Sequence, residues 1–220
     1  MSARDAVLRR IRKALANELD ADAAPAYELW PAGTWAAPDD LFDRFVEELK
    51  RVQGEGHRFR TLDEAKRFLS ALHNEIGAPG TILADHPTCR LLGGALPAEK
   101  LEIVDPAMDR QRLAAIPLAV LPAEFLLADT GSVVLHPKSH AERLVCYLPE
   151  VAVVVAGPGS LVAHLSDVWD RITARATDVG VRGEMLLVTG PSRTADIEKK
   201  LVLGAHGPKR LVVLVVEETV

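Results

Sequence analysis

A turn rich in groups that bind anions follows an apolar run near the end of the chain. The run, Met185–Val188, predicts a strand, and the Gly-Pro pair behind it would end that strand. Two hydroxyl side chains and a guanidinium come next, and free backbone N–H groups in such a turn would point away from the sheet. We therefore predict a site for a small carboxylate or phosphate. Its ligand-binding residues would be Thr189, Gly190, Ser192, Arg193 and Thr194.

A short helix is expected to follow this turn. Ser192 and Thr194 both suit an N-cap, and acidic residues fall in the first turn of the helix, where its dipole favours negative charge. Gly204 is a natural C-terminal stop. The chain would then turn into a last buried strand, Leu211–Val216.

His206 is the histidine with the most suggestive surroundings. It lies near two glycines, just before the last predicted strand, and its turn would neighbour the turn at Ser192. A neutral imidazole there could orient a bound anion or act as a base, so His206 and Gly207 join the candidate ligand-binding residues. The alternative is a turn histidine whose hydrogen bonds are satisfied within the fold.

Two carboxylates interrupt the apolar stretch 118–136. Burial would raise the pKa values of Glu124 and Asp129, and a raised pKa suits a general acid or base. Together with His206 they are the candidate catalytic residues. Thr130 and Gly131 are further candidate ligand-binding residues, because polar groups inside an apolar run need partners or a function. The alternative is an exposed glutamate and an aspartate that caps a turn.

Familiar nucleotide and nucleophile motifs are incomplete in this chain. Gly157-Pro158-Gly159 lies between a predicted strand and a predicted helix, but Val162 stands where a dinucleotide fingerprint needs glycine or alanine. The turn at Gly190 has no P-loop lysine. Thr194 replaces the last glycine of a nucleophile elbow, so Ser192 is not expected to be acylated.

A metal site is not predicted either. His136 and His140 have the spacing of a metal pair, with Glu142 nearby, but Pro137 breaks the helix that would place both histidines on one face.

The two cysteines, Cys89 and Cys146, limit the redox chemistry of the chain. They are too few for an iron–sulfur cluster, which usually takes four thiolates, and for a disulfide scaffold. We therefore expect no metal or cofactor in this chain, and a reducing, cytoplasmic location.

The overall composition is that of a globular protein. The 220 residues, 48% of them hydrophobic, suffice for one α/β domain with a sizeable core. A net charge of −5 argues against a nucleic-acid-binding protein, which usually shows a basic face. Neither a transmembrane segment nor a signal peptide is expected, because no sufficiently long apolar run occurs.

The first 40 residues differ from the rest. Ser2–Asn17 predicts a basic amphipathic helix, which could dock on its own domain, on a neighbouring subunit or on an anionic surface. The stretch 18–40 has neither helical nor strand periodicity and predicts an extended arm, in which Trp30 and Trp35 would anchor in a groove of this chain or of a partner.

Strands and helices alternate over most of the remaining chain. Strands are predicted over 57–60, 81–84, 101–104, 118–122, 131–135, 151–156, 185–188 and 211–216, and helices over 39–53, 61–76, 109–115 and 160–176. The apolar strands predict an α/β fold, with a largely parallel sheet flanked by helices on its two faces. Ligands in such folds bind beyond the carboxyl ends of strands, so we expect a site at Thr189–Thr194 or Gly157–Ser160.

Several stretches resemble a known family. Thr189–Glu198 and Leu201–Pro208 closely resemble the hallmark of the LUD domain family. Asp129–Ser132 resembles the Glu-Thr-Gly-Thr strand of that family, with aspartate in place of glutamate. Glu142-Arg143-Leu144 and Leu148-Pro149 also look like family positions.

The resemblance implies a fold similar to the sugar-phosphate isomerase and CoA-transferase group, in a domain covering 41–220 behind the N-terminal helix and arm, 1–40. It also implies a part in the oxidation of L-lactate to pyruvate, alongside two partner subunits that carry iron–sulfur clusters. It does not supply a catalytic residue for this subunit.

Two functions of different classes follow. The chain is expected to be an accessory, non-redox subunit that binds a partner, a small anion or both. The alternative is a stand-alone enzyme that acts on a sugar phosphate or a CoA ester, as the fold relatives do. Assembly into a homo-oligomer is left open in both.

Overall fold

The computed structural model describes residues 3–17, 41–176, 184–195, 201–203 and 207–218. The chain divides into two compact units, Met1–Ala36 and Ala37–Val220. The first contains α1 (Ala3–Asn17), which agrees with the predicted helix, and the apolar side chains of Val7 and Ile11 on it are exposed. The predicted arm lies outside the described residues. No helix of the described segments has the length and apolar composition needed to cross a membrane.

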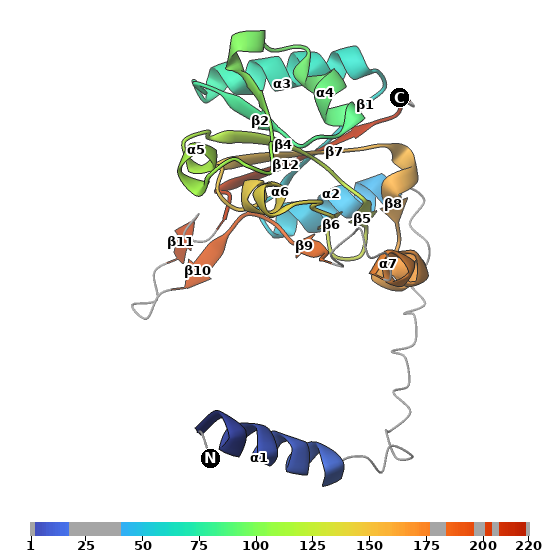
Figure 1. Cartoon of the computed structure of the whole chain (residues 1–220). Helices are drawn as coiled ribbons and strands as arrows, with labels where there is room; N and C mark the ends of the chain where they lie inside the picture. Colours follow the sequence, from blue (N-terminus) through green and yellow to red (C-terminus); the bar gives the residue numbers. More distant parts are fainter. Residues whose placement is uncertain (1–2, 18–40, 177–183, 196–200, 204–206, 219–220) are drawn as a thin grey trace. The chain divides into compact units, whose positions relative to one another are not determined.

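A six-stranded parallel sheet forms the core of the second unit (Figure 1). Its strands, in spatial order, are β1 (Glu55–Phe59), β12 (Arg210–Val216), β7 (Val151–Ala156), β4 (Leu118–Pro122), β2 (Thr81–Leu83) and β3 (Leu101–Ile103). The central strands are buried on both faces, which explains their continuous apolar sequences. The predicted α/β fold with a largely parallel sheet is confirmed.

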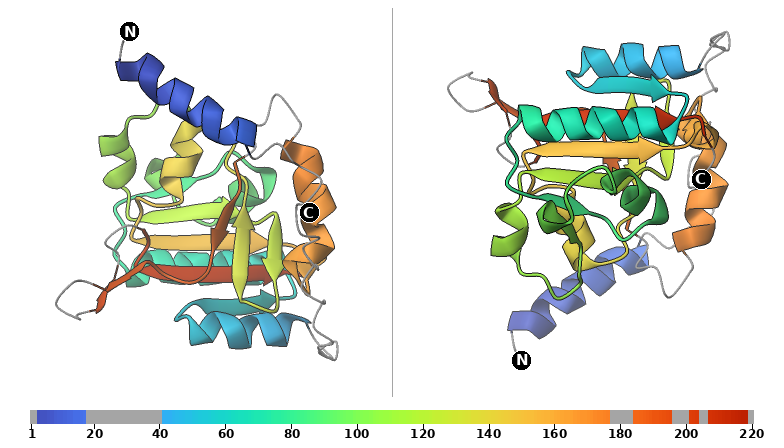
Figure 2. Two further views of the ribbon diagram at one scale, coloured as in Figure 1. Left: turned by 90° about the horizontal axis from the view of Figure 1, so that it is seen from below. Right: turned by 90° about the horizontal axis from the view of Figure 1, so that it is seen from above.

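Helices cover both faces of this sheet. Figures 1 and 2 show α3 (Leu62–Glu75) and α4 (Pro87–Gly93) on one face, and α2 (Leu41–Arg51) and α6 (His140–Val145) on the other. The short helix α5 (Arg110–Ala114) packs against α6. A capping box begins α3: Thr61 Oγ1 accepts the Glu64 N–H, and the Glu64 carboxylate accepts the Thr61 N–H.

A second, four-stranded sheet lies on the α2 side. Its order is β8 (Leu161–Val162), β5 (Phe125–Leu127), β6 (Ser132–Leu135) and β9 (Leu186–Val188). β6 is antiparallel to both β5 and β9. The sequence did not predict β5, because only two residues separate it from β4 and no turn signal marks the change of sheet.

The long helix predicted over 160–176 is wrong in its first half. A 3₁₀ turn (Pro158–Ser160), β8 and a second 3₁₀ turn (Leu165–Val168) precede α7 (Trp169–Ala176). The pairing of β8 with β5 overrides the helical spacing of the apolar residues here. Trp169, the first residue of α7, is 55% exposed.

His73 is a buried histidine in the core of this unit. It is 2% exposed, and its Nδ1 lies 3.0 Å from the Thr81 hydroxyl. Burial lowers the pKa of His73, and the charge of Lys100 lowers it further. Below the ordinary pKa of about 6.5 the unfolded chain therefore binds a proton that the folded chain resists, so stability falls as the pH falls.

We expect the free energy of unfolding to decrease from pH 7.5 to pH 5, by at most about 1.4 kcal/mol per pH unit for each such histidine. Urea unfolding at both pH values measures this decrease. The double variant His73→Leu/Thr81→Val removes both polar partners and should show a smaller decrease. A decrease as large as that of the wild type would show that His73 is not responsible.

Candidate functional site

The turn after Val188 lies in the second sheet. β9 is antiparallel to β6, so Thr189 does not stand at the carboxyl end of a strand in the parallel sheet, contrary to the prediction. The Thr189 Oγ1 lies 2.6 Å from the Ser132 Oγ, which joins the two family motifs by a hydrogen bond. This contact holds β9 to β6 at the end of the sheet.

The helix predicted after this turn is wrong. Arg193–Ala195 forms β10 and pairs with β11 (Leu201–Leu203) in an antiparallel ladder. The Ser192 N–H donates to the Pro208 carbonyl at 2.8 Å, so this amide is not free to bind an anion. Side chains that could cap a helix are thus outcompeted by strand pairing.

Two candidates of this region lie where the structure describes no side chain. His206 lies outside the described residues, and so does the Thr194 side chain. Gly207 is described: a Cβ on it would stand 3.2 Å from the Ser192 Cβ. The ligand-binding role of these residues stays a prediction.

Gly131, in Asp129–Ser132, packs against α2, and Gly190, in Thr189–Glu198, packs against Val52 just after α2. Gly131 has φ +62° and Gly190 has φ +84°, which are strained for other residues. A Cβ on Gly131 would overlap the backbone of Leu49 and stand 2.7 Å from the Glu48 carbonyl carbon, and one on Gly190 would stand 2.5 Å from the Val52 oxygen. These glycines therefore let the second sheet approach the α2 backbone.

Asp129 pairs with a histidine that the sequence did not single out. Its Oδ2 lies 3.1 Å from the Nδ1 of His164, and its N–H donates to the Ala163 carbonyl. Its Oδ1 is buried and has no hydrogen-bond partner among the described residues. Asp129 and Thr130 both lie in the β5–β6 turn, and Thr130 is exposed. An acid–base role for Asp129 stays a prediction.

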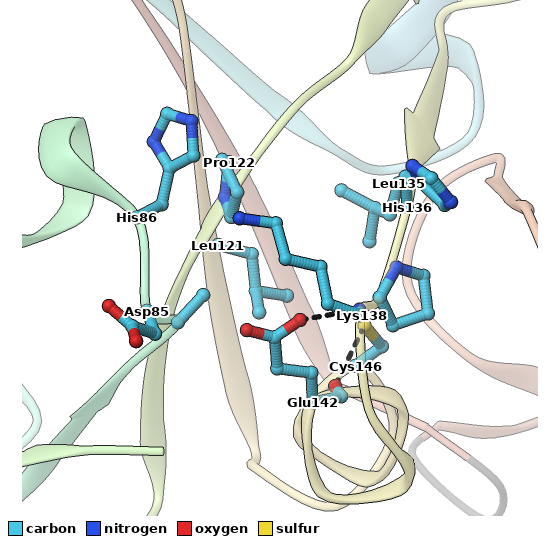
Figure 3. A pocket seen from close by; sticks show the side chains of 11 residues that line it. Asp85, His86, Leu121, Pro122, Leu135, His136, Lys138, Glu142 and Cys146 are labelled. Carbon is cyan, nitrogen blue, oxygen red and sulfur yellow. Dashed lines mark hydrogen bonds between the residues drawn. The ribbon is translucent and has the colours of Figure 1, made fainter. Parts of the chain in front are cut away.

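A pocket with apolar and polar lining residues opens elsewhere, where β2, β4 and β6 end (Figure 3). Its enclosed space is about 30 Å³, enough for one or two groups the size of water. The polar side chains that line it are Asp85, His86, His136, Lys138 and Glu142. Beyond the carboxyl ends of parallel strands is where α/β folds bind ligands, so we take this pocket, hereafter the β2–β4 pocket, as the candidate functional site.

Lys138 and Glu142 dominate the pocket. Figure 3 shows the Lys138 side chain extended across the pocket toward Pro122 and His86, with Glu142 on the α6 side. Glu142 is 8% exposed, and its Oε2 accepts the Lys138 N–H at 2.6 Å. The Ser139 Oγ accepts the Glu142 N–H and begins α6. The local turn thus fixes the backbone at Lys138 and the carboxylate of Glu142.

The two histidines of the pocket favour the neutral form. Burial lowers the pKa of His86, and the Lys138 charge lowers it further, against the raising effect of the carboxylates Glu124 and Glu142 and of Asp85. Burial also lowers the pKa of His136, with Arg175 as the next cause. The Nδ1 of His86 is buried without a hydrogen-bond partner among the described residues.

Arginines pair with the outer carboxylates of this region. Arg175 lies 2.8 Å from Glu124, and Arg90 lies 2.8 Å from Asp85. Glu124, a candidate acid or base from the sequence, is thereby placed beside the β2–β4 pocket with its charge compensated. Of the two candidate catalytic residues that the structure describes, Glu124 and Asp129, Glu124 is the one near this pocket.

His86 and Lys138 were not predicted from the sequence as site residues. Both follow closely on predicted strands, Thr81–Ala84 and Gly131–Leu135. For His86 that position was the available signal, because residues just beyond strand ends gather at one edge of a parallel sheet. Lys138 follows β6, which lies in the second sheet, so the rule does not apply to it. Their partner Glu142 comes from the following helix. Within the described segments, no group of three His, Cys, Asp or Glu residues is arranged to hold a metal ion.

Both cysteines are buried near this pocket. Burial raises the pKa of Cys89 and of Cys146 to about 12, and the charge of Glu142 adds to both shifts. The Cys146 Sγ donates to the Glu142 carbonyl at 3.4 Å. Thiols in such surroundings are poor nucleophiles and poor metal ligands.

Comparison with known proteins adds a relationship across most of the chain. Residues 42–216 match the model of the LUD domain. Lactate utilization protein C of Geobacillus thermodenitrificans is 27% identical, over 98% of this chain and 96% of that protein. The uncharacterized protein YkgG of Escherichia coli is 26% identical, over 81% of this chain and 79% of its own length.

A solved structure has the same fold. A DUF162 family protein from Deinococcus radiodurans superposes with a TM-score of 0.56 at 17% sequence identity, covering 80% of this chain and 96% of that chain.

Proposed function

The chain belongs to the LUD domain family, and from that premise we propose that it is an accessory, non-redox subunit of a bacterial L-lactate utilization system. In this proposal partner subunits with iron–sulfur clusters carry the electrons from L-lactate, and this chain binds a small anion in the β2–β4 pocket. The proposed location is the cytoplasm.

One observation is the main support for a role in lactate utilization. The similarity to lactate utilization protein C extends over 98% of this chain and 96% of that relative, so it is not confined to one shared segment. A relative that matches over nearly its whole length supports a shared role in lactate utilization more strongly than a local motif would.

The chemistry of the cysteines supports a non-redox role. An iron–sulfur cluster takes several thiolates, usually four. This chain has two cysteines, and burial raises the pKa of each to about 12, so both favour the thiol form. The cluster ligands are therefore proposed to lie in partner subunits.

The charges at the pocket bear on the alternative, an enzyme acting on a sugar phosphate or a CoA ester. A phosphate dianion there would meet Lys138 but also the buried carboxylate of Glu142. Phosphate sites normally collect several donors and cations. This arrangement suits a monoanion better, and it favours the accessory role.

Deletion of the gene tests the proposal. We expect the deletion strain to lose growth on L-lactate as sole carbon source, to keep growth on pyruvate, and to recover on complementation. The purified chain should not reduce a dye with L-lactate by itself, and should support that reaction when combined with its iron–sulfur partners. Unchanged growth on L-lactate, or lactate oxidation by this chain alone, would refute the proposal.

A further inference from the structure

We infer that the β2–β4 pocket binds a short 2-hydroxycarboxylate through Lys138, and that Glu142 makes it prefer the hydroxy acid to the corresponding 2-oxo acid. The choice of lactate as the hydroxy acid rests on the proposed function; the preference for this class of ligand rests on the pocket itself.

The cation of the pocket is available for a ligand. Among the described residues, no carboxylate lies within ion-pair distance of the Lys138 ammonium, whereas Asp85 and Glu124 are each paired with an arginine. Figure 3 shows the Lys138 side chain spanning the pocket rather than folded back on α6. A single unpaired ammonium calls for one negative charge, as a monocarboxylate supplies.

The pocket also offers an acceptor for a hydroxyl group. Glu142 uses Oε2 for the Lys138 N–H, and this bond fixes its carboxylate beside the pocket. The other oxygen, Oε1, remains to accept a hydrogen bond from a ligand. The hydroxyl of a 2-hydroxy acid can donate such a bond, whereas the carbonyl oxygen of a 2-oxo acid has no proton and would be repelled by the carboxylate.

Neutral imidazoles complete the site without adding charge. His86 lines the pocket, and its Nδ1 is buried without a hydrogen-bond partner among the described residues. The enclosed space of about 30 Å³ restricts the deepest part of the ligand to a group as small as a carboxylate or a hydroxyl. This narrow inner part favours a ligand with a small end group.

Calorimetric titration of the purified full chain tests the inference, with L-lactate, pyruvate and inorganic phosphate as separate probes at pH 7.5. We expect L-lactate to bind at least about tenfold more tightly than pyruvate, because the pyruvate carbonyl leaves the Glu142 oxygen unpaired. Phosphate should bind more weakly than L-lactate. Equal affinities for L-lactate and pyruvate, or tighter binding of phosphate, would overturn the inference without any variant.

Two variants assign the contacts. Lys138→Met should lose binding of both carboxylates, and Glu142→Gln should lose the preference between them, because its amide can donate to a carbonyl oxygen. Lys209→Met is the matched control, because Lys209 pairs with Glu150 and does not line the pocket. The affinity of this variant for L-lactate should equal that of the wild type. If a folded Lys138→Met variant binds L-lactate as the wild type does, Lys138 is not the carboxylate contact.

The outcome is separable from that of the growth experiment. If deletion abolishes growth on L-lactate but the chain binds no lactate, the accessory role stands and the inference about the ligand falls. If the chain prefers L-lactate but its deletion leaves growth unchanged, the ligand class stands and the role in lactate utilization falls.

Discussion

Replacement of Gly131 by alanine is expected to lower the free energy of unfolding by about 2–5 kcal/mol, enough to unfold a domain of ordinary stability. Two costs add. An alanine at φ +62° is strained, and its Cβ would overlap the backbone of α2 at Glu48 and Leu49. A backbone cannot give way as a side chain end can, so α2 or the β5–β6 turn must move. Urea unfolding followed by circular dichroism measures the loss.

A second glycine separates these two costs. Gly77 has φ +59°, but a Cβ on it would meet nothing within 4 Å. Gly77→Ala should therefore cost only the backbone strain, about 1–2 kcal/mol. Gly159→Ala has neither strain nor a contact and should be close to neutral. If Gly131→Ala costs no more than Gly77→Ala, the close approach to α2 is not what requires Gly131.

Replacement of Gly190 by alanine is expected to cost nearly as much, about 2–4 kcal/mol, and to do so whether or not a ligand is present. Gly190 has φ +84°, and a Cβ on it would stand 2.5 Å from the carbonyl oxygen of Val52. The effect should appear in unfolding experiments and as low soluble yield. A stable variant that had lost only ligand binding would instead place Gly190 in a binding turn.

A double variant identifies the atoms that clash with the Gly190 substitution. The Cβ and Cγ2 of Val52 would each stand 3.0 Å from the added methyl carbon, and Val52→Ala removes the second of these contacts. The carbonyl oxygen stays. We therefore expect Gly190→Ala/Val52→Ala to remain strongly destabilised. Full recovery in the double variant would mean that side-chain crowding, and not the backbone at Val52, opposes the substitution.

These two glycines belong to stretches that resemble the family. Their contacts show that these stretches help to pack the second sheet against the rest of the domain. Gly131 and Gly190 fit the second sheet to α2, and Ser132 and Thr189 bond the two stretches together. Of the residues proposed to meet the ligand, Lys138 lies outside all the family-like stretches, whereas Glu142 begins the shorter one, Glu142-Arg143-Leu144. A motif that identifies a family need not be the part that binds its ligand.

Much of the fold could be predicted from local sequence. The apolar runs of β7 and β12 predict buried parallel strands, and the Thr61–Glu64 spacing predicts the start of α3. These features depend on residues that are neighbours in the chain. The helix predicted after Arg193 failed for the opposite reason: its residues pair with Leu201–Leu203, and pairing between strands outweighs the weak propensities of a short helix.

The candidate site depended on contacts that local patterns do not carry. Glu124 could be selected from the sequence as a carboxylate in an apolar stretch. His86 and Lys138 follow predicted strands, but that position alone does not show that they share a pocket. They meet because β2 and β4 are adjacent parallel strands and β6 ends beside them, an order set by long-range pairing. The sequence by itself determined the α/β class, the main buried strands and the family. The tertiary structure decided which polar residues share a pocket, because that depends on the spatial order of the strands and not on their spacing along the chain.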